Sequence, residues 1–163
     1  LVVTREKREL PIYALVLARS DGRLGEQLKP SAIDCAVAQA EAARTGIVPP
    51  NAKQSCYIEG RVGSIRIGGS PVSDLAMMLS TRMQRTVIDR TALTGTWDLT
   101  LTYTPEPSQI AQGAVAPGVQ PTFDPNGPSI FTAVQEQLGL KLESTRGPID
   151  VLSITRAEFA KED

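Results

Sequence analysis

The side chains that most often carry out acid–base or nucleophilic catalysis are scarce in this 163-residue chain. Because the sequence contains no histidine, it cannot assemble a Ser-His-Asp or Cys-His pair, and a lone serine or cysteine lacks a general base of suitable pKa. Paired carboxylates could serve a glycosidase, but the acidic residues are scattered and several, such as Asp98, are expected to face solvent. Neither a G-x-G-x-x-G motif nor a P-loop is formed by Gly60, Gly63, Gly68 and Gly69. We therefore predict no catalytic, cofactor-binding or metal-binding residue.

Two cysteines, Cys35 and Cys56, are the remaining groups with distinctive chemistry. A zinc site is not expected, because two thiolates without histidine do not complete a tetrahedral shell. The pair is consistent with two unrelated thiols or with a structural disulfide that closes a loop rich in proline and alanine. Such a bond would stabilise the fold by roughly 3 kcal/mol. We predict the disulfide.

Composition and charge limit the class of protein. With 41% apolar and 21% charged residues, the chain should fold as a single domain over residues 1–163. Seventeen basic against eighteen acidic residues give a net charge of −1, which argues against nucleic acid as a partner. No apolar run approaches the roughly 20 residues that cross a bilayer, so no membrane insertion is predicted. The sequence begins at Leu1 without a basic leader, and we expect it to be a fragment of a longer protein.

The first part of the chain predicts a strand and a short helix. Glu9–Arg19 is typical of a central strand, and the charged segment Thr4–Glu9 is expected to be a solvated approach to it, without a function. Ser31 and Asp34 have the spacing of a capping box before an alanine-rich helix that would end at Gly46.

A helix followed by two strands then occurs twice. The first unit covers residues 63–103 and opens with an alternating strand that should stop at Gly68-Gly69. The second covers residues 129–155, with a turn at Arg146-Gly147 between its strands. The two helices carry matching apolar stripes: Leu75, Leu79 and Met83 in the first, Ile130, Val134 and Leu138 in the second.

The segment between the two units, residues 104–128, is rich in proline and is predicted to be a linker. The fold class is α+β, in which helices from the two pseudo-repeated units pack on one face of a mixed sheet.

Three segments carry a resemblance to a known family: LPIYALVLAR (10–19), SDLAMMLSTRMQRTVIDRTALTGTWDLTLTYTP (73–105) and SIFTAVQEQLGLKLESTRGPIDVLSI (129–154). They resemble the carboxy-terminal part of a large uncharacterised family of soil bacteria whose members look like exported proteins. The same domain is found fused behind membrane metallopeptidases similar to beta-lactam sensors. The resemblance implies an extracytoplasmic setting, which agrees with a disulfide, and it carries over no catalytic residue. The family's turn usually has glycine where this chain has Ala92. More distantly, the units are similar to the short amino-terminal domains of secretins.

Two functions are open. The first is a non-enzymatic binding, sensor or interaction module outside the cytoplasm, with a protein or an envelope ligand as partner. The second is an enzyme or enzyme subunit that uses carboxylates together with residues from a missing amino-terminal portion. For the binding module, the contact surfaces would be a sheet edge and the turns Asp89–Gly95 and Ser144–Gly147, unless these are ordinary solvated turns. The candidate contact residues are Asp89, Arg90, Thr91 and Arg146.

Overall fold

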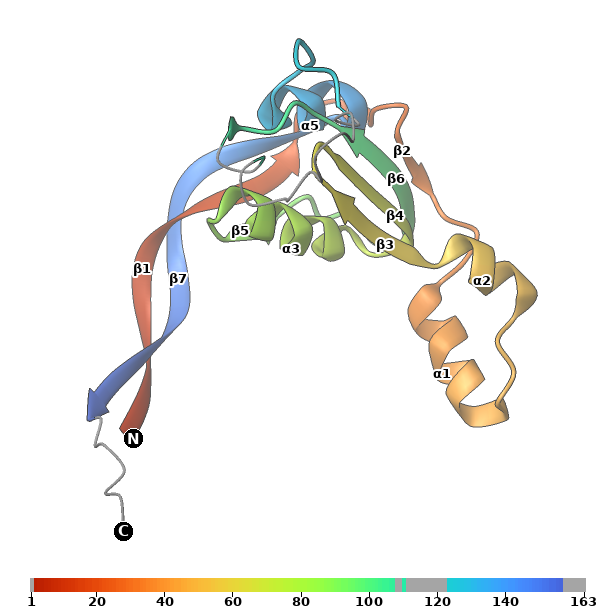
Figure 1. The fold of residues 1–163 in the computed structure, drawn as a ribbon, viewed down its shortest axis with the longest axis horizontal. Coiled ribbons are helices and arrows are strands. Elements are labelled where there is room, and N and C mark those ends of the chain that lie inside the picture. The colour runs from red at the N-terminus through yellow and green to blue at the C-terminus, as the bar shows by residue number, and fades with distance from the viewer. Residues whose placement is uncertain (1, 108–109, 111–122, 157–163) are drawn as a thin grey trace.

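The strands divide between two sheets, whereas the sequence predicted one mixed sheet. The computed structural model describes residues 2–107, 110 and 123–156 (Figure 1). The strands are β1 (Val2–Leu17), β2 (Leu28–Pro30), β3 (Tyr57–Arg61), β4 (Ser64–Ser70), β5 (Val87–Asp89), β6 (Trp97–Thr102) and β7 (Leu140–Arg156). One sheet has the order β5-β1-β7, with β5 parallel and β7 antiparallel to β1. The other is antiparallel, with the order β2-β6-β4-β3.

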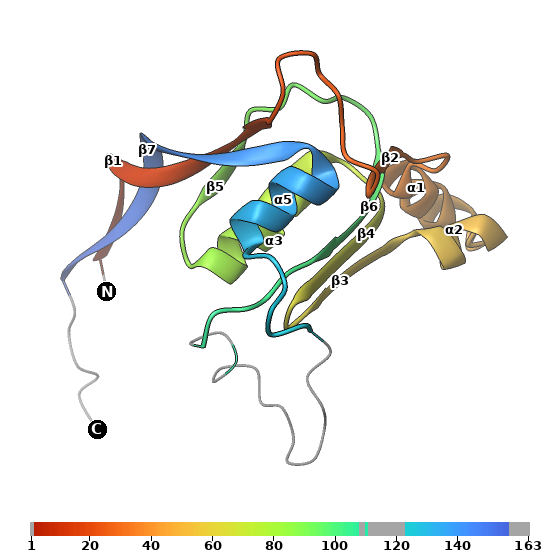
Figure 2. The ribbon, with the colours of Figure 1, turned by 90° about the horizontal axis from the view of Figure 1, so that it is seen from above.

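In the described residues, two helices lie between the sheets and two form a separate lobe. The helices are α1 (Cys35–Thr45), α2 (Pro50–Ser55), α3 (Val72–Met83) and α5 (Ile130–Leu138). Figure 2 shows α3 and α5 in the space between the β1–β7 pair and the four-stranded sheet, while α1 and α2 project at one side. Within the described residues, no helix has the length and apolar character that a membrane crossing requires. The predicted α+β class is confirmed.

The core lies where the two central helices meet both sheets. The helix stripes predicted from the sequence are buried there: Leu75 and Leu79 of α3 and Val134 and Leu138 of α5 have no exposed surface. They pack in one cluster with the inward-facing side chains of β4 and β6, which are Ile65, Ile67, Trp97, Leu99 and Leu101. Burial of these apolar side chains is the main favourable term in the stability of such a core.

Two glycines, Gly25 and Gly139, allow the segment after β1 to cross the end of α5. Gly139 ends α5 with a φ of 69°, and a Cβ added at Gly25 would overlap the backbone carbonyl of Gln137. The backbone nitrogen of Gln27 donates to that carbonyl at 3.0 Å. The Gln137 side chain extends the contact, because its amide bonds both backbone groups of Thr102 in β6. The first connection, α5 and the second sheet are thus held at one point.

β7 is one continuous strand, so the turn predicted at Arg146-Gly147 is not formed. It pairs with β1 from Val3↔Ile154 to Leu17↔Leu140, which gives every residue of the predicted turn a strand partner. Gly147 is buried, and a Cβ there would lie 2.5 Å from Cδ1 of Ile12 in β1. The glycine therefore serves a close contact between neighbouring strands. The second unit consists of α5 followed by a single strand, and it does not repeat the α3–β5–β6 unit in full.

β1 is also longer than predicted, because Thr4–Glu9 belongs to the strand. Beyond the core, residues 2–10 of β1 pair with residues 147–156 of β7. We call this two-stranded arm the ribbon; it projects from the body in Figure 1. Its alternating charges are solvated on a strand whose only described partner at these positions is β7.

Gly68 and Gly69 do not end β4, which continues to Ser70. The β4–β6 register shifts between Ile67 and Ser70, so the glycines form a bulge. Gly69 has a φ of 62°, and its backbone nitrogen donates to Oδ1 of Asp98 at 2.8 Å. A glycine pair can mark a bulge as well as a strand end, since both need unusual backbone angles.

The predicted disulfide joins Cys35 to Cys56, with 5.6 Å between the Cα atoms. We call residues 35–56, with α1 and α2, the disulfide lobe. The helix in the predicted position is capped by the side chain of Asp34, which accepts from the nitrogens of Ala36 and Val37, and not by Ser31. It ends at Gly46 as predicted. A second short helix that the sequence did not predict, α2, begins at Pro50.

Candidate functional site

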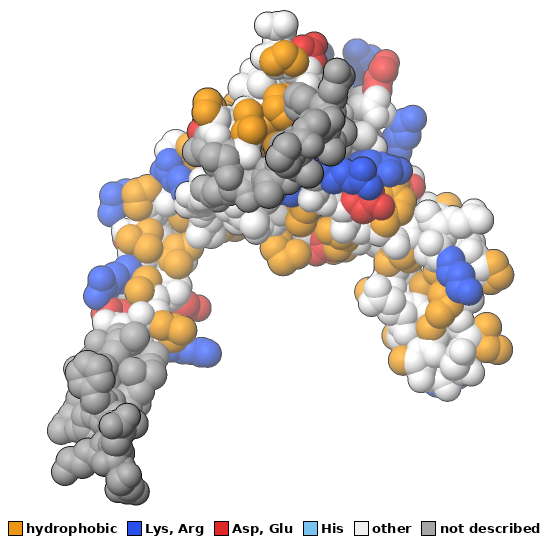
Figure 3. Space-filling model, viewed as in Figure 1, with side chains coloured by type: hydrophobic (Ala, Val, Ile, Leu, Met, Phe, Trp, Pro, Cys, Tyr) orange, Lys and Arg blue, Asp and Glu red, His pale blue; other side chains and the backbone are white. Residues whose placement is uncertain are grey.

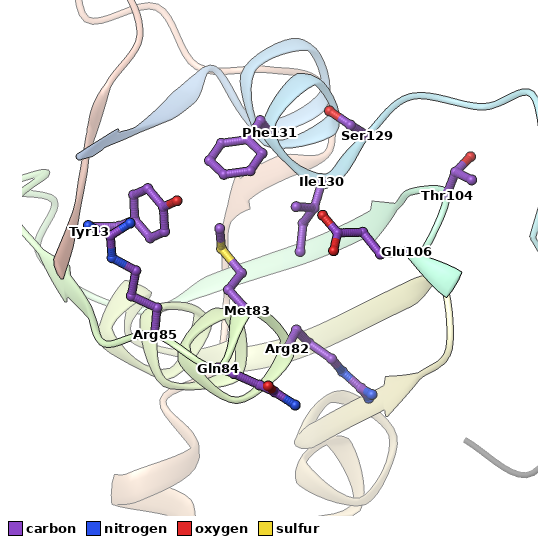
Figure 4. A pocket seen from close by; sticks show the side chains of 10 residues that line it. All are labelled: Tyr13, Arg82, Met83, Gln84, Arg85, Thr104, Glu106, Ser129, Ile130 and Phe131. Atoms are coloured by element: carbon purple, nitrogen blue, oxygen red, sulfur yellow. The ribbon is translucent and has the colours of Figure 1, made fainter. Parts of the chain in front are cut away.

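A pocket of about 210 Å³ opens between the end of α3, the start of α5 and β1. We call it the α3–α5 pocket; Figure 4 shows ten of the side chains that line it. Its lining combines an apolar wall with charged groups on either side. A concave site with an apolar wall and a few polar groups is the usual form of a small-molecule site.

The apolar wall is built from an aromatic pair. Tyr13 comes from the middle of β1 and Phe131 from the first turn of α5. Their ring centroids are 5.5 Å apart and the planes meet at 72°, an edge-to-face arrangement that aromatic pairs favour. Met83 and Ile130 continue this wall. In Figure 4 the Met83 side chain lies below the Phe131 ring. Phe131 is 40% exposed, so its ring is available at the rim of the pocket.

Two arginines approach the pocket from the carboxyl end of α3. Arg82 lies in the last turn, where cations are favoured by the helix dipole. Gln84 caps the carboxyl end of the helix with a φ of 50°, in the left-handed region, and Arg85 is the next residue. Cζ of Arg85 lies 4.2 Å from the centroid of the Tyr13 ring, a cation–π contact.

The guanidinium of Arg85 is fixed but not fully bonded. Its Nη2 donates to Oγ of Ser144 at 3.1 Å, whereas its Nε is buried and has no hydrogen-bond partner among the described residues. A guanidinium carries five N–H donors, and this one uses few of them. Arg82 has a further effect: burial raises the pKa of the Tyr103 phenol, and the positive charge of Arg82 partly opposes that rise.

The wall opposite the arginines carries Glu106, Thr104 and Ser129. Ser129 caps α5 by accepting from the nitrogen of Thr132, so the amino end of that helix faces the pocket. In Figure 4 the Glu106 carboxylate points toward Ile130. The described lining thus contains two arginines and one carboxylate, which leaves the pocket net positive. The carboxylate pair that a glycosidase needs is not assembled among these residues.

The residues predicted as contacts lie elsewhere, and Arg146 is apart from the other three. β1 separates them, because Asp89 pairs with Leu15 on one side and Arg146 pairs with Pro11 on the other. Thr91 is only 4% exposed. It has an internal role, since Asp89 Oδ1 accepts from both its nitrogen and its hydroxyl.

Arg90 is exposed in the turn after β5. Arg146 lies within a strand, and its Nη2 donates to the backbone oxygen of Glu9 at 2.8 Å. A contact role for the exposed members of this set remains a prediction.

Sequence reasoning missed the pocket because its residues carry no shared motif. Tyr13 was placed in the predicted strand Glu9–Arg19 and Phe131 in the helix of the second unit, which explained both as structure. The available signal was the pair of arginines at the end of an otherwise apolar helix stripe. That signal is weak, since basic residues are common in the last turn of any helix.

Residues 1–157 match a family model described as a protein of unknown function (DUF3738). No curated protein and no solved structure matches the chain.

Proposed function

Since the chain belongs to the DUF3738 family, whose function is unknown, we propose a function from its geometry. The protein is a non-enzymatic binding module that works outside the cytoplasm and takes a small organic anion in the α3–α5 pocket. One observation carries the proposal: Arg85 is held over Tyr13 beside an aromatic wall, with part of its guanidinium unbonded. The pocket thereby offers a positive charge and a flat apolar surface together.

The location is supported by the disulfide. Disulfides persist in oxidising compartments and are rare where thiols are kept reduced. Cys35 and Cys56 are the two cysteines of the chain, and they are joined to each other. The resemblance to exported proteins favours the same setting.

The location is tested by trapping thiols in intact cells that produce the protein from its natural gene. Rapid acid quenching followed by alkylation marks every free cysteine. We expect neither cysteine to be marked before reduction and both to be marked after it. Marking of both cysteines without reduction would contradict a site of action outside the cytoplasm.

The ligand class follows from the size and charge of the pocket. A volume of about 210 Å³ lies below the roughly 300–1,000 Å³ of sites for drug-sized ligands. The arginines suit a planar oxyanion such as a carboxylate, which an arginine can bind with two parallel hydrogen bonds. The Tyr13–Phe131 wall suits a ring or another flat apolar group. A monocyclic carboxylate combines these properties.

The test is a titration followed by backbone amide NMR. Benzoate, phenylacetate and cyclohexanecarboxylate are the probes, with benzamide and inorganic phosphate as controls for charge and for the ring. We expect a ring-bearing carboxylate to shift amides of the first turn of α5 and the last turn of α3. Benzamide lacks the charge and phosphate lacks the ring, so both should bind at least about tenfold more weakly.

Variants locate the site. Arg85→Gln should weaken binding of the best probe at least about tenfold, since a charge-assisted hydrogen bond contributes roughly 1.5–3 kcal/mol. Phe131→Ala should also weaken it, because it removes one ring of the apolar wall on which the ring of the probe packs. Arg44→Gln is the matched control, because Arg44 is exposed on α1 and outside the pocket lining. Binding that survives the first two variants, or no binding by any probe, would show that the pocket is not the ligand site.

A further inference from the structure

One long edge of β1 has no partner strand among the residues that the structure describes. β5 pairs only with residues 13–15 of β1, so in the described part of the chain nothing pairs with residues 2–12 on that side. These residues belong to the ribbon and its junction with the body. A two-stranded ribbon is marginally stable in water, because its backbone groups on both edges are left to solvent.

The direction of the free backbone groups follows from two hydrogen bonds. The nitrogen of Tyr13 donates to the oxygen of Thr86, and the oxygen of Leu15 accepts from Arg90. Both groups therefore point away from β7. Backbone groups alternate in direction along a strand, and the β1–β7 register is constant from Val3 onward. Every second residue of β1 therefore directs its backbone groups to the free side: Val3, Arg5, Lys7, Glu9 and Pro11.

The outer edge of β7 is less suited to pairing. Pro148 lies opposite Glu9, whose backbone groups face away from β7, so the proline nitrogen faces the outer edge of its own strand. Proline has no N–H, and one at this place interrupts any ladder along the edge. On β1 the edge is uninterrupted from Val3 to Glu9, and proline appears only at Pro11, where the free edge ends.

We propose that a second copy of this chain pairs with the free edge of β1, antiparallel, about a two-fold axis at Lys7. In this register Arg5 lies opposite Glu9 of the second copy, and Glu6 lies opposite Arg8. The interface is isologous, so each of these pairs occurs twice. The two three-stranded sheets join into one continuous sheet through strand addition. This inference does not depend on the ligand proposed for the α3–α5 pocket.

Length fixes the register independently of charge. Residue 7 is the midpoint of the free edge 2–12, so the second strand ends where β5 begins and displaces nothing. A register centred on Arg8 would place Val3 of the second copy against Tyr13, whose nitrogen is bonded to Thr86. That register conflicts with β5.

Charge excludes the register shifted the other way. Centred on Glu6, the pairing would set Arg5 opposite Lys7, and like charges directly opposite are destabilising. Figure 3 shows basic and acidic side chains together on the ribbon. Arg8 already forms an ion pair with Glu6 on the same strand, and the proposed register extends it into a network of four charges.

Two local features are compatible with a two-fold axis at Lys7. Lys7 meets its own copy there, but each Lys7 is opposite Asp150 in the β1–β7 register, so the two positive charges lie between two negative ones. The Glu9 oxygen already accepts from Arg146, yet a carbonyl oxygen has two lone pairs and can accept a second bond.

Charge-swap variants test the pairing by sedimentation velocity over a concentration series. We expect the unaltered protein to form a dimer as its concentration rises. Arg5→Glu and Glu9→Arg should each weaken the dimer at least tenfold, because each swap creates two like-charge contacts. The double variant Arg5→Glu/Glu9→Arg restores opposite charges and should recover the dimer. A monomer at every concentration, or single variants that dimerise like the unaltered protein, would overturn the proposal.

Cysteine crosslinking tests the register. Cys35 and Cys56 are paired, so Lys7→Cys introduces the single free thiol. Facing residues of antiparallel strands have Cα atoms about 4.5–5.5 Å apart, within the reach of a disulfide. Lys7→Cys should therefore crosslink to its own copy.

Arg5→Cys is the matched control for this crosslink. It should not crosslink alone, because two copies of residue 5 lie on opposite sides of the axis, but it should crosslink when mixed with Glu9→Cys. Equal crosslinking of Arg5→Cys and Lys7→Cys on their own would refute the register.

Discussion

Removing the Cys35–Cys56 bond measures how much the disulfide lobe contributes to stability. The two cysteines are separated by 21 positions, and the chain-entropy relation for a loop of that length gives about 3.3 kcal/mol at about 25 °C. The double variant Cys35→Ala/Cys56→Ala removes the bond, and reduction of the unaltered protein removes it without changing a side chain.

The lobe itself makes this value an upper limit. Cys35 is the one buried residue of α1, and Ala52 is the one buried residue of α2. A helix as short as these is not stable by itself in water. Without the bond the lobe should unfold while the body stays folded. The folded state then gains conformational entropy in the lobe, which offsets part of the entropy that the unfolded state gains when the bond is removed. We therefore expect a loss of about 2–3.3 kcal/mol in the free energy of unfolding.

The assay is urea denaturation followed by two signals. The chain has one tryptophan, Trp97, which is 8% exposed in the core, so its fluorescence reports on the body. Hydrogen exchange of the α1 amides reports on the lobe. Reductant should not affect the double alanine variant, which controls for other effects of the reagent. A loss below about 1 kcal/mol with the α1 amides still protected would refute the reasoning, since the bond would then add little to a lobe that is stable alone.

Two further predictions concern backbone geometry. Ala92 has a φ of 59°, where an alanine costs roughly 1–2 kcal/mol, so Ala92→Gly should raise the free energy of unfolding by up to about 1 kcal/mol; a lower midpoint in urea would contradict this. Gly25→Ala should cost more than about 2 kcal/mol because its Cβ would overlap the Gln137 carbonyl, which cannot move without displacing α5. The control is Gly46→Ala, where the added Cβ would have no atom within 4 Å; unlike Gly25, Gly46 has a positive φ, so backbone strain alone should cost it roughly 1–2 kcal/mol, and a cost as large as that of Gly25→Ala would show that the overlap is not the cause.

Local patterns in the sequence predicted several elements correctly. The stripes of α3 and α5 and the alternation at the start of β4 were identified because helix and strand periods differ and these segments are half-buried. The disulfide was also predicted, although the sequence alone left two free thiols as an alternative. The resemblance also showed that the family's turn usually has glycine where this chain has Ala92. The positive φ of Ala92 explains why glycine is favoured at that position.

The errors concern residues whose role depends on a distant partner. Gly147 was taken as a turn glycine, but it lies within β7, close to the Ile12 side chain of β1. A glycine signals an unusual demand without stating which demand it is. The α3–α5 pocket was missed for the same reason, since Tyr13, Arg85 and Phe131 meet only through the long β1–β7 pairing and the end of α3.

The disulfide lobe makes part of the chain exchangeable. Because the Cα atoms of Cys35 and Cys56 are 5.6 Å apart, the intervening polypeptide leaves the body and returns to it at almost the same place. A short glycine-serine connection can span that gap, so excision or replacement of residues 36–55 leaves β2 and β3 where they are. Length changes in such a segment have a small entropic cost. The body can therefore serve as a scaffold on which peptides of different length and sequence are grafted.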